Sequence, residues 1–100
     1  VVIEAFLEEC QSLIPRLCAS VKERDSAGLK RAAHSLKGSL LSVGANSTAA
    51  LAFELERMGT TGEMDRSDEA LYQLVRQLEA LKPLLKHGPP PEQSQSDSIR

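Results

Sequence analysis

Leucine and other aliphatic residues recur every three or four positions along most of this chain, and this spacing constrains the fold more than any other feature. Side chains three and four apart share one face of an α-helix, whereas a half-buried strand needs strict alternation, which is not seen here. Four stripes of this kind can be followed: Ile3, Phe6, Cys10, Leu13, Leu17 and Val21; Leu29, Ala33, Leu36, Leu40 and Val43; Leu51, Leu55 and Met58; and Leu71, Leu74, Leu78, Leu81 and Leu85. The pattern predicts four amphipathic helices.

Two prolines fall inside these stripes. We expect the first helix over residues 1–23 and the second over residues 26–43, entered through the turn "RDSAG". A proline inside a helix lacks the amide hydrogen and collides with the preceding turn. Pro15 therefore predicts a kink or a loosened turn in the first helix, and Pro83 predicts a kinked or separate last turn in the fourth.

Polar breaks in the pattern predict the ends of the third and fourth helices. The segment "GANS" interrupts the stripes, and Asn46 or Ser47 can cap the third helix, which Gly59 is placed to end. After the polar loop "GTTGEMDRS", Asp65 or Ser67 can cap the fourth helix. Amphipathic helices joined by short connections pack antiparallel, so we predict an all-α fold, an antiparallel four-helix bundle.

One hundred residues hold a single domain of this kind. We assign residues 1–87 to the bundle and residues 88–100, "GPPPEQSQSDSIR", to a disordered tail or linker, because that segment has almost no apolar content. Cys10 and Cys18 are eight apart on one expected helix, about 12 Å along its axis, which is too far for a disulfide. We expect both to be small buried side chains in a reducing compartment.

The overall charge and composition exclude several classes of function. A net charge of −2 does not attract nucleic acid or an anionic membrane surface. No apolar run approaches the roughly 20 residues that span a bilayer, and the first residues show no signal-peptide pattern. A hydrolase or a metalloenzyme is not favoured, because His34 and His87 lie far apart and no convergent carboxylate pair is seen. We expect no nucleic-acid partner, no membrane insertion and no metal site.

Residues 33–45, "AHSLKGSLLSVGA", carry a histidine and a glycine that an amphipathic helix does not need. On a helical wheel that sets Leu29 at zero, the core stripe lies near 0°, whereas His34 falls at about 140° and Gly38 at about 180°. Lys37 falls at about 80°, one turn from the histidine. The pattern predicts that His34 faces solvent with a lysine beside it.

Such a face suits phosphoryl chemistry. A neutral imidazole is a nucleophile near neutral pH, and an ammonium three residues further on can offset the charge of phosphoryl oxygens. Gly38 weakens the helix by roughly 1 kcal/mol relative to alanine, but it leaves space for a phosphoryl group or a partner loop. Leu41, at about 120°, offers apolar contact to a docking protein. From the residues alone, an ordinary polar helix surface remains the alternative.

The stretch "AAHSLKGSLLSVGA", followed by "LAFELERMG", resembles the signature of histidine-containing phosphotransfer (HPt) domains. That signature runs H-x-L-K-G, then a glycine ten positions after the histidine, then a helix that ends in L-E or L-Q. The matching residues are His34, Leu36, Lys37, Gly38, Gly44, Leu55 and Glu56. The resemblance extends over the four-helix pattern of residues 1–87.

The resemblance implies a role for each residue of the motif. His34 would be the phosphoacceptor, through Nε2, and Lys37 would stabilise the phosphoryl group. Gly38 would provide clearance. Glu56, on the third helix, would orient the histidine, because a bond to Nδ1–H fixes the tautomer and leaves Nε2 free.

Four further residues are candidates for the border of the site or for partner docking. Gln11, on the first helix, is expected to border the site. Lys30 and Arg31 are expected to steer an acidic partner surface, and Leu41 is expected to contact it.

The resemblance implies a phosphocarrier of a two-component phosphorelay, and not an enzyme. A receiver-domain phospho-aspartate would pass its phosphoryl group to His34, which would pass it to the aspartate of another response regulator. One alternative is direct phosphorylation by the ATP-binding domain of a histidine kinase, as in chemotaxis-type kinases. The other alternative is a helical interaction module without phosphochemistry.

The partners implied by the resemblance are response-regulator receiver domains and, if the domain is a module of a hybrid kinase, the histidine kinase of the same polypeptide. This domain would bind no cofactor, since the receiver would bring the Mg²⁺. We expect a cytoplasmic monomer, either free-standing or the cytoplasmic module of a membrane-bound hybrid sensor kinase.

Overall fold

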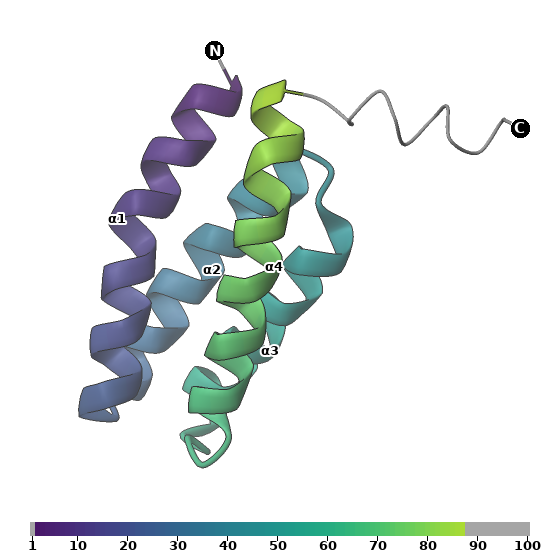
Figure 1. Ribbon diagram of the computed structural model, residues 1–100. Helices are drawn as coiled ribbons and strands as arrows, with labels where there is room; N and C mark the ends of the chain where they lie inside the picture. The colour runs from purple at the N-terminus through teal and green to yellow at the C-terminus, as the bar shows by residue number, and fades with distance from the viewer. Residues whose placement is uncertain (1, 88–100) are drawn as a thin grey trace, which may run out of the picture.

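The computed structural model of the chain describes residues 2–87, with side-chain positions for residues 4–84. It contains four helices, α1 (Val2–Glu23), α2 (Ser26–Ser42), α3 (Asn46–Thr61) and α4 (Ser67–His87). Consecutive helices run antiparallel, and each packs against two neighbours in the cyclic order α1–α2–α3–α4 (Figure 1). The predicted all-α, antiparallel four-helix bundle is confirmed. The predicted tail at residues 88–100 and the side chains of Ile3 and Leu85 lie outside the described residues.

Neither proline divides its helix. α1 continues through Pro15, and α4 continues through Pro83 without a separate last turn. Both prolines are exposed, so a carbonyl that lacks its helical partner one turn earlier can bond to water. Within residues 2–87, no helix combines the length and apolar character needed to cross a bilayer.

Backbone and side-chain groups near the turns replace the caps that the sequence suggested. Asp25 caps α2, and its Oδ1 accepts a hydrogen bond from the Gly28 amide at 3.0 Å. The prediction that Asn46 or Ser47 caps α3 is wrong, because Ala45 occupies the cap position and forms no side-chain cap bond. α3 therefore begins on backbone bonds alone, the first of them from Ala49 N to Ala45 O at 2.9 Å.

The start of α4 also differs from the prediction. Ser67 is the first helical residue, and its buried hydroxyl donates to the Met64 carbonyl at 2.7 Å. Asp65 instead pairs with Arg24 of the α1–α2 turn, with 3.2 Å between Oδ1 and Nη2. The buried Ser67 hydroxyl thus ties the loop to the first turn of α4, and the exposed Arg24–Asp65 pair adds a contact between the two connections.

Gly59, which we expected to end α3, lies inside that helix at its contact with α2. The helix continues to Thr61, and Gly62, with φ of +81°, forms the left-handed cap that follows it. A Cβ atom on Gly59 would come within 2.6 Å of the Lys30 amide nitrogen and 2.7 Å of the Ser26 carbonyl oxygen. Only glycine permits this approach of two backbones, so Gly59 sets the spacing between α2 and α3.

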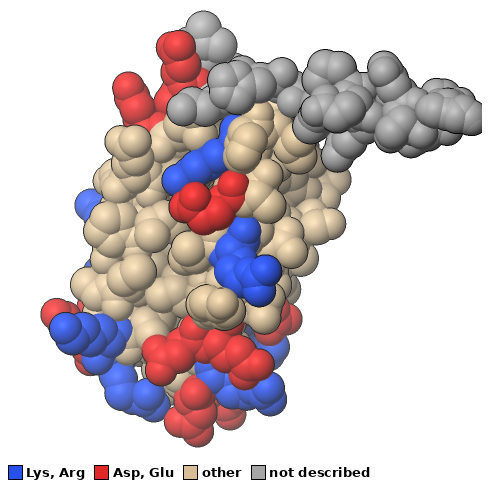
Figure 2. All heavy atoms as spheres, viewed as in Figure 1, with Lys and Arg blue, Asp and Glu red and all other residues tan. Residues whose placement is uncertain are grey.

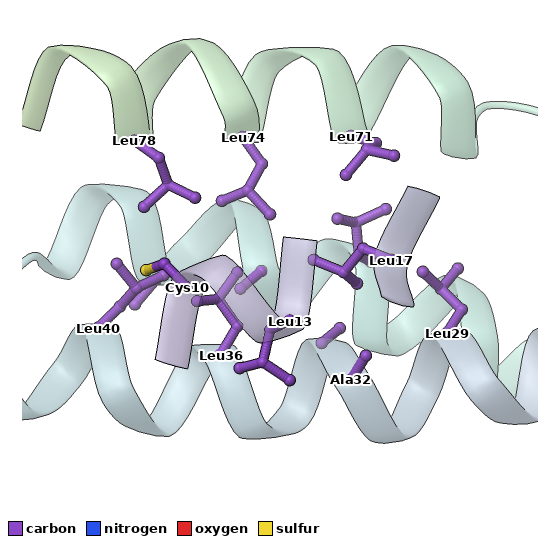
Figure 3. Close-up of a cluster of buried hydrophobic side chains, with 14 of the residues drawn as sticks. Cys10, Leu13, Leu17, Leu29, Ala32, Leu36, Leu40, Leu71, Leu74 and Leu78 are labelled. Atoms are coloured by element: carbon purple, nitrogen blue, oxygen red, sulfur yellow. The ribbon is translucent and has the colours of Figure 1, made fainter. Parts of the chain in front are cut away.

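The core consists almost wholly of aliphatic side chains. Figure 3 shows leucines of α4 pointing toward those of α1 and α2. Six leucines expose none of their surface: Leu17, Leu29, Leu36, Leu40, Leu55 and Leu74. Each buried leucine stabilises the fold by about 1.5–3 kcal/mol relative to an exposed one. Cys10 is buried among them, whereas Cys18 is exposed, so the expectation of two buried cysteines is right for Cys10 alone.

Candidate functional site

His34 lies on the solvent side of α2. Its side chain is 67% exposed, and the prediction that it faces away from the core is confirmed. The neighbouring residues Ala33 and Leu36 are fully buried, and they fix the rotation of α2 that turns His34 outward.

Glu56 reaches this imidazole from α3. Its Oε2 lies 3.0 Å from His34 Nδ1, and only 16% of the Glu56 side chain is exposed. When Nδ1 carries the ring proton, it donates to this carboxylate and leaves the lone pair of Nε2 free. The arrangement favours a defined tautomer of an accessible imidazole.

Lys37 pairs with the other oxygen of the same carboxylate. Its Nζ lies 2.9 Å from Glu56 Oε1, and 23% of the lysine side chain is exposed. Oε1 is buried and forms no hydrogen bond with the described residues, since its contact with Lys37 is an ion pair without hydrogen-bond angles. The ammonium charge offsets the cost of burying this oxygen. The Lys37 ammonium lowers the pKa of the Glu56 carboxyl, burial works against this, and His34 adds to the lowering. Glu56 is therefore a carboxylate shared between two nitrogen groups of α2.

Phe53 belongs to this group and was missed by the sequence analysis. Its ring centroid lies 5.1 Å from Lys37 Nζ, within cation–π range, and 48% of the residue is exposed. Phe53 precedes Glu56 by three residues, so both side chains meet the lysine from one face of α3. The available signal was an aromatic residue off the apolar stripe, one turn before the glutamate.

The surface one turn beyond His34 is open. A Cβ atom on Gly38 would meet no atom within 4 Å apart from its chain neighbours and the local helix backbone, so packing among the described residues does not require a glycine there. Leu41, one turn after Lys37, is 52% exposed. Both observations agree with the wheel, which put these two residues on the solvent side of α2.

The three remaining candidate residues lie on different sides of the bundle. Lys30 is exposed on α2, and its backbone contacts α3 at Gly59. Arg31 turns to the other side of α2 and lines a hollow that it shares with residues of α1, among them Arg16. The expectation that Gln11 borders the site is wrong. It lines a groove between α1 and α4 that includes Val75, because this position on α1 turns toward α4 and away from α2.

The face formed by α1 and α4 has a different character. Figure 2 shows a short column of basic and acidic side chains along its middle with uncharged surface on either side, and a denser group of charged side chains at the end of the bundle with the α1–α2 and α3–α4 connections. Among the side chains described, those of residues 4–84, no group of three or more His, Cys, Asp or Glu is placed to hold a metal ion. The carboxylate with two nitrogen partners lies on another face, between α2 and α3.

Comparison with known proteins supplies one positive finding. The family model described as Hpt domain matches residues 1–83, which include every residue of the His34 group. No curated protein and no solved structure matches the chain. The match covers more than half of the chain.

Proposed function

The chain belongs to the Hpt domain family, and we propose that it receives a phosphoryl group on His34 from a receiver-domain phospho-aspartate and passes it to another response regulator. Membership of the family gives the chain a phosphotransfer role in two-component signalling. The observation that supports His34 as the phosphoacceptor is the Glu56 carboxylate bonded to Nδ1 of an exposed imidazole.

The proposed step is an in-line displacement at phosphorus. The lone pair of His34 Nε2 forms the N–P bond while the bond between phosphorus and the aspartyl oxygen breaks, and the electron pair leaves with the aspartate carboxylate. The Nδ1 proton stays on the ring, which gains positive charge. Glu56, 3.0 Å from Nδ1, offsets that charge. Transfer to the second receiver is the reverse displacement.

Lys37 and Gly38 serve the phosphoryl group in this proposal. The Lys37 ammonium is held near the imidazole by the carboxylate they share, so it can reach phosphoryl oxygens on Nε2. Gly38 follows His34 by four residues, and the helical Cβ direction points toward the helix N-terminus. A side chain at position 38 would therefore extend toward the imidazole, and glycine keeps that space open.

Hpt domains interact with response-regulator receivers, and the surface beside His34 supports such docking. Leu41 provides exposed apolar area, and Lys30 provides a positive charge on the same helix as His34. Arg31 contributes only to long-range steering of an acidic partner, because it faces α1. We propose a cytoplasmic monomeric phosphocarrier that binds no cofactor itself and relies on Mg²⁺ bound by the receiver.

The decisive experiment is transfer from a phosphorylated receiver. The wild-type domain should take up label that is acid-labile and base-stable, His34→Gln should take up none, and the matched control His87→Gln should be labelled like wild type. Label retained by His34→Gln would contradict the assignment of the phosphoacceptor.

Two further arms separate the alternatives. A histidine kinase domain with ATP and no receiver tests whether the kinase is the direct donor, which would require His34 to be labelled in that arm. Receiver binding that survives in His34→Ala, with no phosphohistidine in the wild type under any donor, would favour an interaction module instead.

A further inference from the structure

Lys37 is held by two groups of very different kinds. Its ammonium lies 2.9 Å from Glu56 Oε1 and 5.1 Å from the centroid of the Phe53 ring. The carboxylate neutralises the ammonium charge, whereas the ring attracts it through its quadrupole and leaves the full positive charge in place. The two holders sit one turn apart on α3, so they approach the lysine from the same helix.

Phosphorylation of His34 changes the charges that surround Glu56 and Lys37. The carboxylate faces the imidazole through Oε2 and the ammonium through Oε1. Once Nε2 carries a phosphoryl group, the ring becomes positive and the phosphoryl oxygens become a new anionic partner for Lys37. A lysine ammonium is a compact charge on a flexible stem, so it can move from the Glu56 carboxylate to a phosphoryl oxygen. Glu56 meanwhile keeps its hydrogen bond to the imidazole of His34.

We propose that Phe53 is a positioning residue for this transfer: its ring face holds the Lys37 ammonium beside His34 while the ammonium exchanges Glu56 for the phosphoryl group. This inference rests on the proposed function. Without the ring, an ammonium that leaves the carboxylate spreads over the many rotamers of a solvated lysine. With the ring, it stays close to the site and keeps its charge for the phosphoryl oxygens.

The exposure of Phe53 supports a role other than core packing. The residue is 48% exposed, and α3 packs into the bundle through other residues, of which Ala52 and Leu55 are fully buried. Because Phe53 lies outside the core, Phe53→Leu removes the ring face while it retains an apolar side chain on an intact helix. Phe53→Tyr retains the ring face and is the conservative variant.

Transfer kinetics test the proposal. With a phosphorylated receiver at saturating concentration, Phe53→Leu should lower the transfer rate constant by about three- to tenfold, whereas Phe53→Tyr should stay within about twofold of wild type. The half-saturating receiver concentration should change little. In a Lys37→Met background, Phe53→Leu should cause no further loss, because there is no ammonium left to hold.

A control ring and a spectroscopic readout complete the design. Tyr72, on α4, is also exposed, and its ring centroid lies 5.9 Å from Cζ of Arg76. Tyr72→Leu should leave the transfer rate unchanged. In the wild-type domain the ε-methylene protons of Lys37 should show an upfield ring-current shift. That shift should persist in Phe53→Tyr and vanish in Phe53→Leu.

The outcomes that overturn the proposal differ from one another. Phe53→Leu could instead raise the half-saturating receiver concentration, both alone and in the Lys37→Met background. That result would show that Phe53 contacts the receiver and would refute its role in positioning Lys37. An unchanged rate in Phe53→Leu, with wild type normally labelled, would refute this inference and leave the proposed function standing. Absence of label on wild-type His34 with any donor would refute both, even if the ring-current shift is present.

Discussion

The α2–α3 face and the outer face of α4 each place a cation over an exposed aromatic ring, at Lys37–Phe53 and at Arg76–Tyr72. Arg76 follows Tyr72 by four residues on one helix, which is a spacing that any helix surface offers. Lys37 and Phe53 come from different helices, and their cation also pairs with the partly buried Glu56. A local pair of side chains needs only a helix, whereas the Lys37 group needs two helices at a fixed distance and rotation.

The distance between α2 and α3 depends on Gly59, which takes no direct part in the proposed reaction. Gly59 lets the α3 backbone approach Lys30 and Ser26, and Glu56 lies one turn earlier on the same helix. The outer face of α4 has no comparable requirement, because its ring and cation share one backbone. Substitutions should therefore affect the two faces unequally, and the following predictions run from the largest expected effect to the smallest.

Gly59→Ala should destabilise the bundle most. The new Cβ would lie 2.6 Å and 2.7 Å from two backbone atoms of α2 that cannot move independently, so the helices must separate. We expect the free energy of unfolding, measured by urea titration, to fall by about 1–3 kcal/mol. Gly38→Ala is the matched control, since the same chemical change there meets open space. Equal stability of the two variants would show that α2 and α3 are not held close by Gly59.

Glu56→Gln should change how stability depends on pH. The Lys37 ammonium lowers the pKa of Glu56, so above the ordinary glutamate value of 4.5 the folded state gains from this carboxylate. That gain is lost as the pH falls through the lowered pKa. We expect wild type to exceed Glu56→Gln in unfolding free energy at neutral pH, and the difference to shrink as the pH falls below the ordinary value of 4.5 and through the lowered pKa of Glu56.

The exposed pair Glu79–Lys82 on α4 provides the control for this pH effect. Its glutamate is 66% exposed, against 16% for Glu56. Exposed ion pairs contribute about 0–1 kcal/mol, so Glu79→Gln should leave the pH profile close to that of wild type. A Glu56→Gln profile that runs parallel to wild type across the acid range would contradict the shared-carboxylate geometry.

Gly38→Ala should separate stability from transfer. Alanine is the better helix former, and the open surface there imposes no clash, so the unfolding free energy should rise by about 0.5–1 kcal/mol. The added methyl group points toward His34, and transfer from a phosphorylated receiver should slow by about tenfold. A variant that is more stable and equally fast would remove Gly38 from the proposed site.

Arg76→Ala should have the smallest effect of the series. The Arg76–Tyr72 pair lies on the exposed surface of α4, and changes at such positions usually alter stability by less than about 0.5 kcal/mol. Neither thermal unfolding nor phosphoryl transfer should differ measurably from wild type. A transfer defect in this variant would mean that α4 contacts the partner, and the contrast between the two faces would then weaken.

Local chemistry made much of the fold predictable. The aliphatic stripes predicted four helices and most of their core residues, because a side chain's place on a helix depends only on its number along that helix. The same geometry predicted that His34 faces solvent. Helix ends were less predictable, since Ala45 begins α3 without a side-chain cap and Gly62, not Gly59, follows its end.

The site was predictable in its residue types and only partly in its contacts. The resemblance to HPt domains named Glu56 as the partner of His34, and the structure puts its carboxylate 3.0 Å from Nδ1. The pairing of Lys37 with that carboxylate, the contact with Phe53 and the position of Gln11 on the far side of α1 were not foreseen. Each depends on which sides of two helices face each other.

By itself the sequence determined the number of helices, their buried faces and the outward direction of His34, because these follow from hydrogen bonds and side-chain spacing within single helices. The tertiary structure decided that one carboxylate serves both His34 and Lys37 and that a ring covers the ammonium. Those contacts join residues on separate helices. Their geometry is set by the close packing at Gly59, which no pattern along one helix specifies.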